Sequence, residues 1–295
     1  MSKCDVYKNM AADYGAMVPD RTLKLAALHN TAAEHLITTH INAPGKTNLT
    51  FLDPAAGNGL DGFTIANRDN ERFASIGHVI LADFSPSMAQ QIENNRTRIT
   101  EAGIQLCDTT ILQGGMADIV TTHPHLRENV DVALITHTLV QSHDFITTWD
   151  QYREYVTTSL SGIRETLSGR DGLLVVDFRD WENLIPQLEE KNRQNIFLSD
   201  HTETQYAIRY KWELANEVEA LHTARITLQR DPEKNENGDV IFTQESAPVQ
   251  YGGMTRQTML DIFADAGLTP VGAPIESHHC LADDEPYLTF ALQAS

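Results

Sequence analysis

Short apolar runs alternate with segments of helical periodicity along the first 180 residues. Each run is four to seven residues long, which is the length of a buried strand. The runs cover residues 49–53, 78–83, 110–113, 130–136 and 173–177, and the helical segments cover about 59–66, 85–103 and 149–167. Strands that alternate with helices form βαβ units. We therefore predict an α/β fold with a Rossmann-like, doubly wound, mostly parallel seven-stranded sheet.

The pattern changes at the N-terminus and after residue 181. Residues 5–40 have helical periodicity, and Pro19 divides this lead-in into two helices, with Asp20 as a cap for the second. Residues 182–250 contain polar alternating runs and turn signals such as Asn237-Gly238, which predict an antiparallel insertion. We expect residues 1–181 and 251–295, which end in a helix at about 255–266 and a strand at 287–292, to form one domain with an N-terminal helical cap. Residues 182–250 then form an inserted β-rich subdomain.

The charge of the chain narrows its range of partners. The 295 residues carry a formal net charge of −19, and 41% of them are hydrophobic, as in an ordinary soluble globular protein. Because a negative field repels nucleic acid and anionic lipid, we expect neither as a partner. The acidic composition reflects either a solubility surface or adaptation to high salt or to organic solutes.

The location of the protein is predicted from its cysteines and from its apolar runs. Cys4, Cys107 and Cys280 lie far apart and have no metal-ligand spacing, which favours a reducing compartment over a disulfide framework. No run is long enough to span a membrane, and residues 1–5 do not begin a signal peptide. We therefore expect a cytoplasmic protein.

Two of the apolar runs end in a carboxylate. The first run ends at Asp53 and continues as a loop of small residues in which Gly57 and Gly59 allow a ligand to approach the bare backbone. The second run ends at Asp83, where a nucleotide ribose lies in many α/β folds. The two acids and the glycine loop together predict a cofactor that contains a nucleoside.

The order of these features resembles the class I S-adenosylmethionine-dependent methyltransferases over about residues 45–180. In that family the glycine loop approaches the methionine part of the cofactor, and the acid after the second strand holds the ribose hydroxyls. The resemblance assigns Asp83 to the ribose. It assigns the loop to Asp53, Ala55, Gly57 and Gly59, where the spacing does not match the G-x-G-x-x-G pattern of nicotinamide enzymes. Further cofactor contacts are expected from Phe84, Met88, Gly115, Met116, Ala117, His137 and Arg21, with residues 115–117 beside the adenine and Met116 alternatively a core residue.

A narrower resemblance begins at the last apolar run of the alternating part. The segment Leu174-Val175-Val176-Asp177-Phe178-Arg179-Asp180-Trp181 resembles the glycine, sarcosine and dimethylglycine N-methyltransferases. In that family an arginine at the position of Arg179 pairs with the carboxylate of the amino-acid acceptor. A planar guanidinium binds both carboxylate oxygens at once, which orients the acceptor amine.

Three other residues are candidates for contacts with the acceptor. His143 follows the fourth apolar run, where the family has a histidine, and is either an active-site residue or a structural one. Leu139 stands where the family has an asparagine, so this wall of the acceptor site differs. Tyr14 and Tyr251 resemble pocket aromatics, and glycine neighbours favour Tyr251 as a ligand contact. His278-His279 reads as a solvated loop, and we predict no metal site.

These features predict an S-adenosylmethionine-dependent N-methyltransferase that acts on a small amine or amino acid of the glycine, sarcosine or dimethylglycine type. We expect a small-molecule acceptor as its partner, and the sequence leaves open whether the chain forms a homo-oligomer. Methyl transfer from a sulfonium needs alignment of a neutral amine and exclusion of water more than it needs a strong base. The alternatives are an N- or O-methyltransferase of specialised metabolism, a non-catalytic S-adenosylmethionine-binding regulatory protein and, more weakly, a nicotinamide dehydrogenase.

Overall fold

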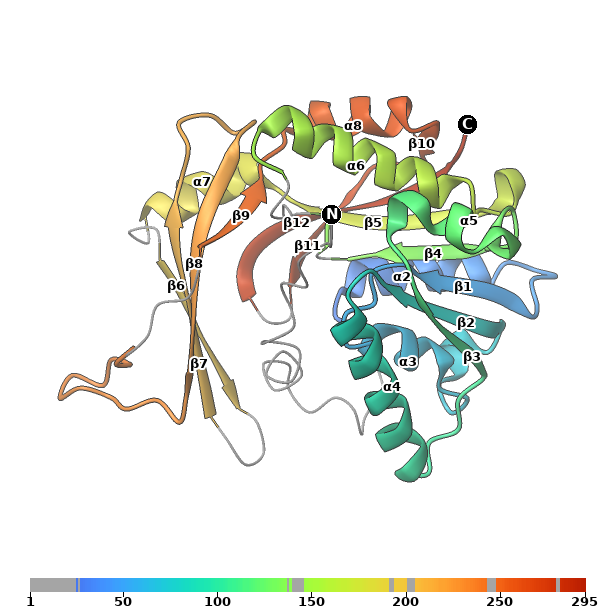
Figure 1. Ribbon diagram of the computed structural model, residues 1–295, viewed down its shortest axis with the longest axis horizontal. Coiled ribbons are helices and arrows are strands. Elements are labelled where there is room, and N and C mark those ends of the chain that lie inside the picture. Colours follow the sequence, from blue (N-terminus) through green and yellow to red (C-terminus); the bar gives the residue numbers. More distant parts are fainter. Residues whose placement is uncertain are drawn as a thin grey trace.

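A computed structural model of the chain contains two sheets (Figure 1). It describes residues 25, 27–136, 138–139, 146–190, 194–200, 205–242, 248–279 and 282–295. The larger sheet has the strand order β10-β12-β5-β4-β1-β2-β3, and β11 pairs with β12 beside this path. Its strands are β1 (Leu49–Asp53), β2 (Ile76–Asp83), β3 (Asp108–Gln113), β4 (Val132–Ile135), β5 (Leu173–Arg179), β10 (Leu268–Pro270), β11 (Ile275–His279) and β12 (Ala282–Ala294).

The five strands from β3 to β5 are parallel, whereas β12 runs antiparallel to β5. The fold class is therefore confirmed, and seven strands lie on the main path. The additional strand β11 was not predicted, and it contains His278 and His279, so the prediction of a solvated loop at these residues was wrong. Backbone pairing with β12 orders a segment whose polar sequence gave no strand signal.

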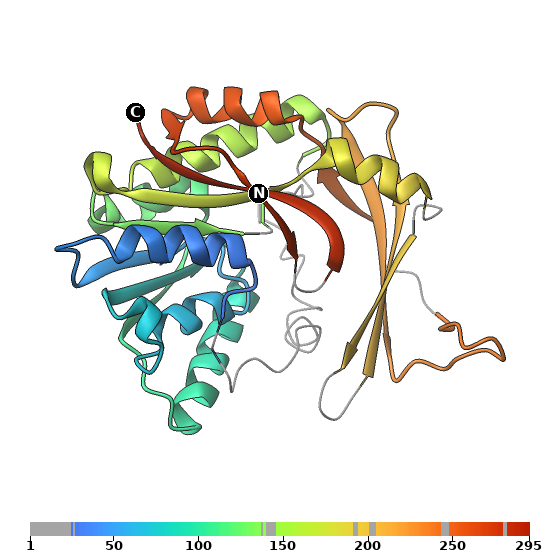
Figure 2. The ribbon, with the colours of Figure 1, turned by 180° about the vertical axis from the view of Figure 1, so that it is seen from behind.

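Helices cover both faces of the larger sheet (Figures 1 and 2). One face carries α2 (Thr31–Ile41), α3 (Leu60–Ala66) and α4 (Pro86–Glu101), and the other carries α5 (Ile119–Thr122), α6 (Trp149–Arg164) and α8 (Arg256–Asp265). Short 3-10 helices are η1 (Glu71–Phe73), η2 (Met116–Asp118), η3 (Pro124–Leu126) and η4 (Gly169–Asp171). Neighbouring residues of β1 point to opposite faces, and Phe51 and Leu52 are both fully buried, in two different cores. Burial on both faces explains why the strand is a continuous apolar run.

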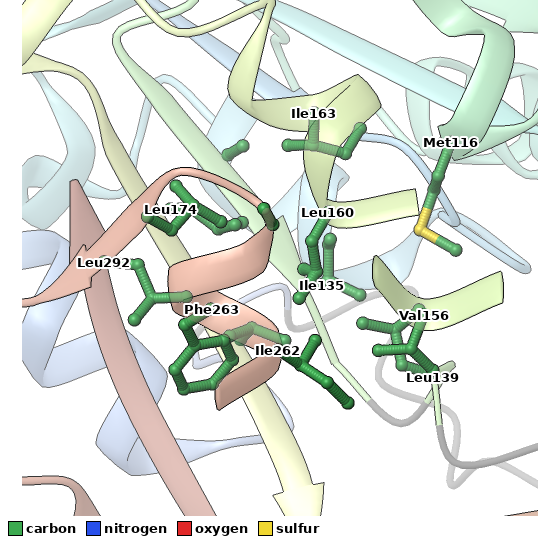
Figure 3. Packing of buried hydrophobic residues seen from close by; sticks show 14 of the residues in the cluster. Met116, Ile135, Leu139, Val156, Leu160, Ile163, Leu174, Ile262, Phe263 and Leu292 are labelled. Carbon is green, nitrogen blue, oxygen red and sulfur yellow. The ribbon is translucent and has the colours of Figure 1, made fainter. Parts of the chain in front are cut away.

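The core between the sheet and the α6–α8 layer is shown in Figure 3. Leu160 and Ile163 of α6 and Phe263 of α8 contribute fully buried side chains to it. Met116 of η2 packs into the same core. The loop after β3 is thereby joined to the helical layer.

The second sheet is antiparallel and has the order β6-β7-β8-β9. Its strands are β6 (Gln194–Asp200), β7 (Gln205–Glu213), β8 (Leu221–Arg230) and β9 (Pro248–Gly252), and it stands beyond the carboxyl end of β5 in both views (Figures 1 and 2). Before it lies α7 (Trp181–Glu190), a helix within the region predicted to be an antiparallel insertion. That prediction was wrong here because Trp181, Leu184 and Leu188 repeat at helical spacing and are all buried. One of the polar alternating runs of residues 182–250 begins at Val240, and over residues 240–242 it forms no strand, because Val240 makes only an isolated bridge with Lys234.

The lead-in helix begins later than predicted. Pro19 and Asp20 lie outside the described residues, and the helix α2 starts at Thr31. Asn30 caps it, because the Asn30 side chain accepts hydrogen bonds from the backbone N–H groups of Ala32 and Ala33 at 3.0 and 3.1 Å. Leu25 and Leu28 are buried in the core without being helical. Among the described helices, none is long and apolar enough to cross a membrane.

Candidate functional site

The glycine loop lies at the carboxyl end of β1, beside the carboxyl end of β2. Gly57 and Gly59 have φ angles of +55° and +80°, in the left-handed region that favours glycine. A side chain at position 59 would place its Cβ 2.9 Å from Phe63 Cε2, so this position also requires the close approach that glycine allows. The backbone angles of the loop are therefore those that the glycines were predicted to allow, and the close approach at Gly59 is to side chains of the protein itself, at the start of α3. The approach of a ligand stays a prediction.

Asp83 connects the glycine loop to β2. Its Oδ2 accepts a hydrogen bond from Gly57 N at 3.0 Å, and its Oδ1 accepts one from Ser85 N at 2.8 Å. The residue is 5% exposed, so these N–H groups compensate a carboxylate that burial would otherwise disfavour. Ser85 in turn caps α4 through Met88 N at 3.2 Å, and Met88 is buried. Phe84, which lies between Asp83 and Ser85 in the chain, is half-buried.

Asp53 is a buried acid in an acidic environment. It is 8% exposed and accepts a hydrogen bond from Ala55 N at 3.3 Å. Burial raises the pKa of Asp53 well above its ordinary value, and the neighbouring carboxylates of Asp61 and Asp83 add to the rise. A cationic ligand group beside Asp53 would favour its ionised form. The carboxyl edge of β1 and β2 is thus suited to positive charge.

The loop after β3 is held against α6. Gly115 N donates to Asp118 Oδ1 at 3.2 Å, so Asp118 organises its own loop. Met116 is buried, in agreement with the alternative that it is a core residue, whereas Ala117 is exposed. On the helix side, a Cβ at Gly162 would lie 2.3 Å from Met116 O. Backbone meets backbone here.

Tyr155 of α6 is a residue that sequence reasoning missed. It is half-buried and packs against the core that also contacts Ala55. Burial raises the pKa of Tyr155 to about 12, and the negative charge of Asp83 contributes to the rise. The Tyr155 hydroxyl is therefore neutral near physiological pH and lies within the electrostatic reach of Asp83. Its signal in the sequence was ordinary helix periodicity.

Arg179 ends β5 inside a group of aromatic rings. The guanidinium carbon lies 4.6 Å from the ring centre of Tyr251, 5.2 Å from that of Trp212, 5.9 Å from that of Tyr287 and 6.0 Å from that of Trp181. Arg179 Nε donates to the Tyr287 hydroxyl at 3.1 Å, and the residue is 6% exposed. Cation–π contacts compensate part of the lost hydration of a buried guanidinium. We call Arg179 with these four aromatic residues the arginine cage.

His222 supports the arginine cage from β8. Its ring stacks on Trp181 with 4.4 Å between centres and 24° between planes. Nδ1 accepts a hydrogen bond from Ala215 N at 3.2 Å, and Nε2 donates to Val218 O at 3.1 Å. This pattern needs the neutral ring, and burial lowers the pKa of His222 accordingly.

Tyr251 is brought to Arg179, but its glycine neighbours do not act as predicted. A Cβ at Gly252 would lie 1.9 Å from Tyr152 Cε1, and one at Gly253 would lie 1.9 Å from Val218 O. Both glycines therefore allow close packing within the protein. Tyr251 itself is 1% exposed and tilts against Trp212 with 5.0 Å between ring centres.

Tyr152 links α6 to the loop after β4. Its hydroxyl donates to Leu139 O, its ring packs on Gly252, and burial raises the pKa of that hydroxyl. Leu139 is fully buried in the core of Figure 3, where an asparagine would leave a polar group. Packing in this core therefore accounts for a leucine at position 139. The other candidates, Tyr14, Arg21, His137 and His143, lie outside the described residues.

His29 and Asp61 form a pair that the sequence did not reveal. His29 Nδ1 lies 2.6 Å from Asp61 Oδ1, and His29 N donates to the same oxygen at 2.9 Å. Asp61 is the second residue of α3, directly after the glycine loop. A separation of 32 residues in the chain hid this contact from any reading of local pattern.

The fold of the chain is similar to that of known proteins, although its sequence is not. No protein-family model and no curated protein sequence matches the chain. Solved structures do. The chain is similar to an S-adenosylmethionine-dependent methyltransferase from Clostridium acetobutylicum, with a TM-score of 0.62, 12% identity and coverage of 96% of this chain and 99% of that chain. The chain has the fold of these methyltransferases.

Two further structures agree in fold. An amino pentose methyltransferase of calicheamicin biosynthesis from Micromonospora echinaspora has a TM-score of 0.53, 16% identity and coverage of 89% of this chain and 90% of that chain. An S-adenosylmethionine-dependent methyltransferase from Methanosarcina mazei has a TM-score of 0.50, 9% identity and coverage of 88% and 96%. At such identities the likeness establishes the shared architecture alone.

Proposed function

We propose that the chain is an S-adenosylmethionine-dependent methyltransferase. The observation that carries this proposal is the hydrogen bond between Gly57 N and Asp83 Oδ2, which joins the glycine loop to the acid at the end of β2. A loop of mostly small residues beside an oriented carboxylate suits a nucleoside with its ribose hydroxyls. The fold shared with solved methyltransferases gives this geometry its context.

The residues of the site fit this cofactor in charge as well as in shape. The buried acids Asp53 and Asp83 suit the ammonium group and the ribose hydroxyls, respectively. The left-handed φ angles of Gly57 and Gly59 shape the loop after β1, beside which the methionine chain of the cofactor would lie. When bound, S-adenosylmethionine supplies a methyl group that its sulfonium activates. The loop after β3, at residues 115–117, would lie beside the adenine.

For the acceptor we propose a small amine that carries a carboxylate, of the glycine, sarcosine or dimethylglycine type. Arg179 supports this choice, because its guanidinium ends β5 at the same edge of the sheet as Asp83. A buried guanidinium binds a carboxylate through charge-assisted hydrogen bonds that its aromatic surroundings strengthen. Residues 182–250 and α7 would then form the acceptor side of the enzyme.

In this proposal the protein acts mainly by alignment. Arg179 holds the acceptor carboxylate, so that the amine faces the methyl group in line with the bond that breaks. Tyr251 and Tyr287 fix the guanidinium and limit the water around it. The acceptor amine gives its proton to solvent before binding, so the reaction needs no strong base in the protein.

Arg179 variants test this function. Loss of a charge-assisted pair costs about 1.5–3 kcal/mol, so Arg179→Lys, which keeps the charge but not the fork, should lower kcat/KM for the acceptor about 10- to 150-fold. Affinity for S-adenosylhomocysteine, measured by calorimetry, should stay within about twofold of wild type. Arg225→Lys on β8 is the matched control, since Arg225 pairs with Glu213 at 3.2 Å on a half-exposed surface.

The acceptor is identified with an amine panel and the wild-type protein. Turnover of simple amino acids supports the proposal, whereas turnover only of amines or alcohols without a carboxylate would replace it with a methyltransferase of specialised metabolism. Binding of S-adenosylhomocysteine without turnover of any member would favour a regulatory protein. NADH titration distinguishes a nicotinamide enzyme.

A further inference from the structure

His29 lies in a segment that hydrogen bonds join to the larger sheet on one side and to α3 on the other. Its neighbour Asn30 donates to Asp177 Oδ2 on β5 at 2.9 Å and to Thr289 Oγ1 on β12 at 3.0 Å. On the other side, the His29 ring and backbone both bond to Asp61 Oδ1 on α3. The segment therefore reaches from β5 to the start of α3, and the side chains of His29 and Asp61 are only 11% and 12% exposed.

The fold fixes which part of the cofactor comes near this pair, if the proposed function holds. β2 lies between β1 and β3 in the sheet. With the ribose at Asp83 on β2 and the adenine at the loop after β3, the amino-acid end must extend the opposite way, over the end of β1. Asp53 ends β1, and Asp61 is the second residue of α3, which begins directly after the loop of residues 54–59. The amino-acid end therefore meets the group formed by His29, Asp53 and Asp61.

The charges at this end are unequal. Asp61 and Asp83 lie close enough to Asp53 to add to the rise in its pKa, so a cationic group of the cofactor, its ammonium or its sulfonium, is favoured beside these acids. The same acids repel the carboxylate of the cofactor, which therefore needs a basic side chain as its partner. Among the described residues, His29 is a basic side chain that pairs with one of these acids, Asp61.

We propose that His29, oriented by Asp61, binds the α-carboxylate of the cofactor while Asp53 faces its ammonium group. With Nδ1 turned to Asp61, the opposite ring nitrogen Nε2 is the atom that donates to the carboxylate when both nitrogens carry protons. Asp61 is a positioning residue in this arrangement. The inference rests on the proposed function for the identity of the cofactor.

Three ligands separate the parts of the cofactor in calorimetric binding experiments. S-adenosylhomocysteine has both the amine and the carboxylate, decarboxylated S-adenosylhomocysteine keeps only the amine, and 5′-methylthioadenosine has neither. We expect His29→Ala to weaken S-adenosylhomocysteine about 10- to 100-fold, the loss that a charge-assisted hydrogen bond predicts, and to leave the other two within about twofold. His29→Gln should give a smaller loss with the same selectivity. His35→Ala, an exposed histidine on α2, is the matched control and should change none of the three.

The outcomes are distinct. Equal losses for all three ligands would overturn the inference, because His29 would then support the fold and not the carboxylate. A loss shared by the two amine-containing ligands would overturn the assignment to the carboxylate. Unchanged affinity for S-adenosylhomocysteine in both variants overturns this inference and leaves the proposed function standing. Wild-type protein that binds none of the ligands would overturn both.

Discussion

Gly162 is the point at which the helical layer touches the loop after β3. A Cβ at this position would lie 2.3 Å from Met116 O and 3.1 Å from Ala117 Cα. Both are backbone atoms, which cannot turn aside as a flexible side chain can. Carbon–oxygen contacts are ordinarily about 3.3 Å or longer, so Gly162→Ala must separate α6 from the loop by about 1 Å.

Two opposing terms set the stability of this variant. Overpacking costs about 1–3 kcal/mol, and replacing glycine by alanine inside a helix gains about 1 kcal/mol. We therefore expect a net loss between about 0 and 2 kcal/mol. The loop is the proposed neighbour of the adenine, and losing one of its contacts by displacement costs about 1 kcal/mol, which is an about fivefold weaker affinity for S-adenosylhomocysteine.

Urea unfolding and calorimetry measure the two effects separately. Thr158→Ala, at an exposed position of the same helix, is the control for a gain in helix propensity without a change in packing, and it also removes the hydrogen bond from Thr158 Oγ1 to Glu154 O. If Gly162→Ala were more stable than wild type by about 1 kcal/mol and bound S-adenosylhomocysteine equally well, the close contact between α6 and the loop would be refuted.

Two further predictions concern buried polar groups. Because the folded protein raises the pKa of Asp53, its proton stabilises the fold at low pH, and this contribution is lost as pH rises from the ordinary carboxyl value through the raised one. The stability of Asp53→Asn relative to wild type, from urea unfolding, should therefore be greater at pH 8 than at pH 5, and a difference independent of pH would contradict this. Asn30→Ala loses a helix cap of about 1 kcal/mol and two buried hydrogen bonds, so unfolding should become easier by about 2–4 kcal/mol. A change below about 1 kcal/mol would show that water replaces these bonds.

The parallel half of the fold could be predicted because its signals are local. Runs buried on both faces are continuously apolar, and Ser85 and Pro86 mark the start of α4 within the chain itself. The helix α7 carried an equally local signal, the spacing of its apolar residues, but Pro186 within it is usually a break. The later start of α2 depends on Asn30, whose partners Asp177 and Thr289 are more than 140 residues away.

The residues of the site also differ in whether a local pattern could predict them. The glycine loop and Asp83 could be predicted because each lies at the carboxyl end of an apolar run. Since β1 and β2 are parallel neighbours, these two ends lie side by side, and Gly57 N donates to Asp83 Oδ2. The arginine cage draws Trp212, Tyr251 and Tyr287 from three different strands around Arg179, and only the tertiary fold assembles such a set. The same is true of His29 with Asp61. No alternation or spacing in one segment specifies a contact between two segments.

The arginine cage has a consequence for the entropy of binding. A free arginine side chain loses about 0.5–1.5 kcal/mol of rotamer freedom when a ligand immobilises it. Arg179 is already held by four aromatic rings and by the Tyr287 hydroxyl before any anion arrives. Its conformational freedom is lost during folding, so an anion that binds there gains roughly 2- to 12-fold in affinity over one that must order a mobile arginine.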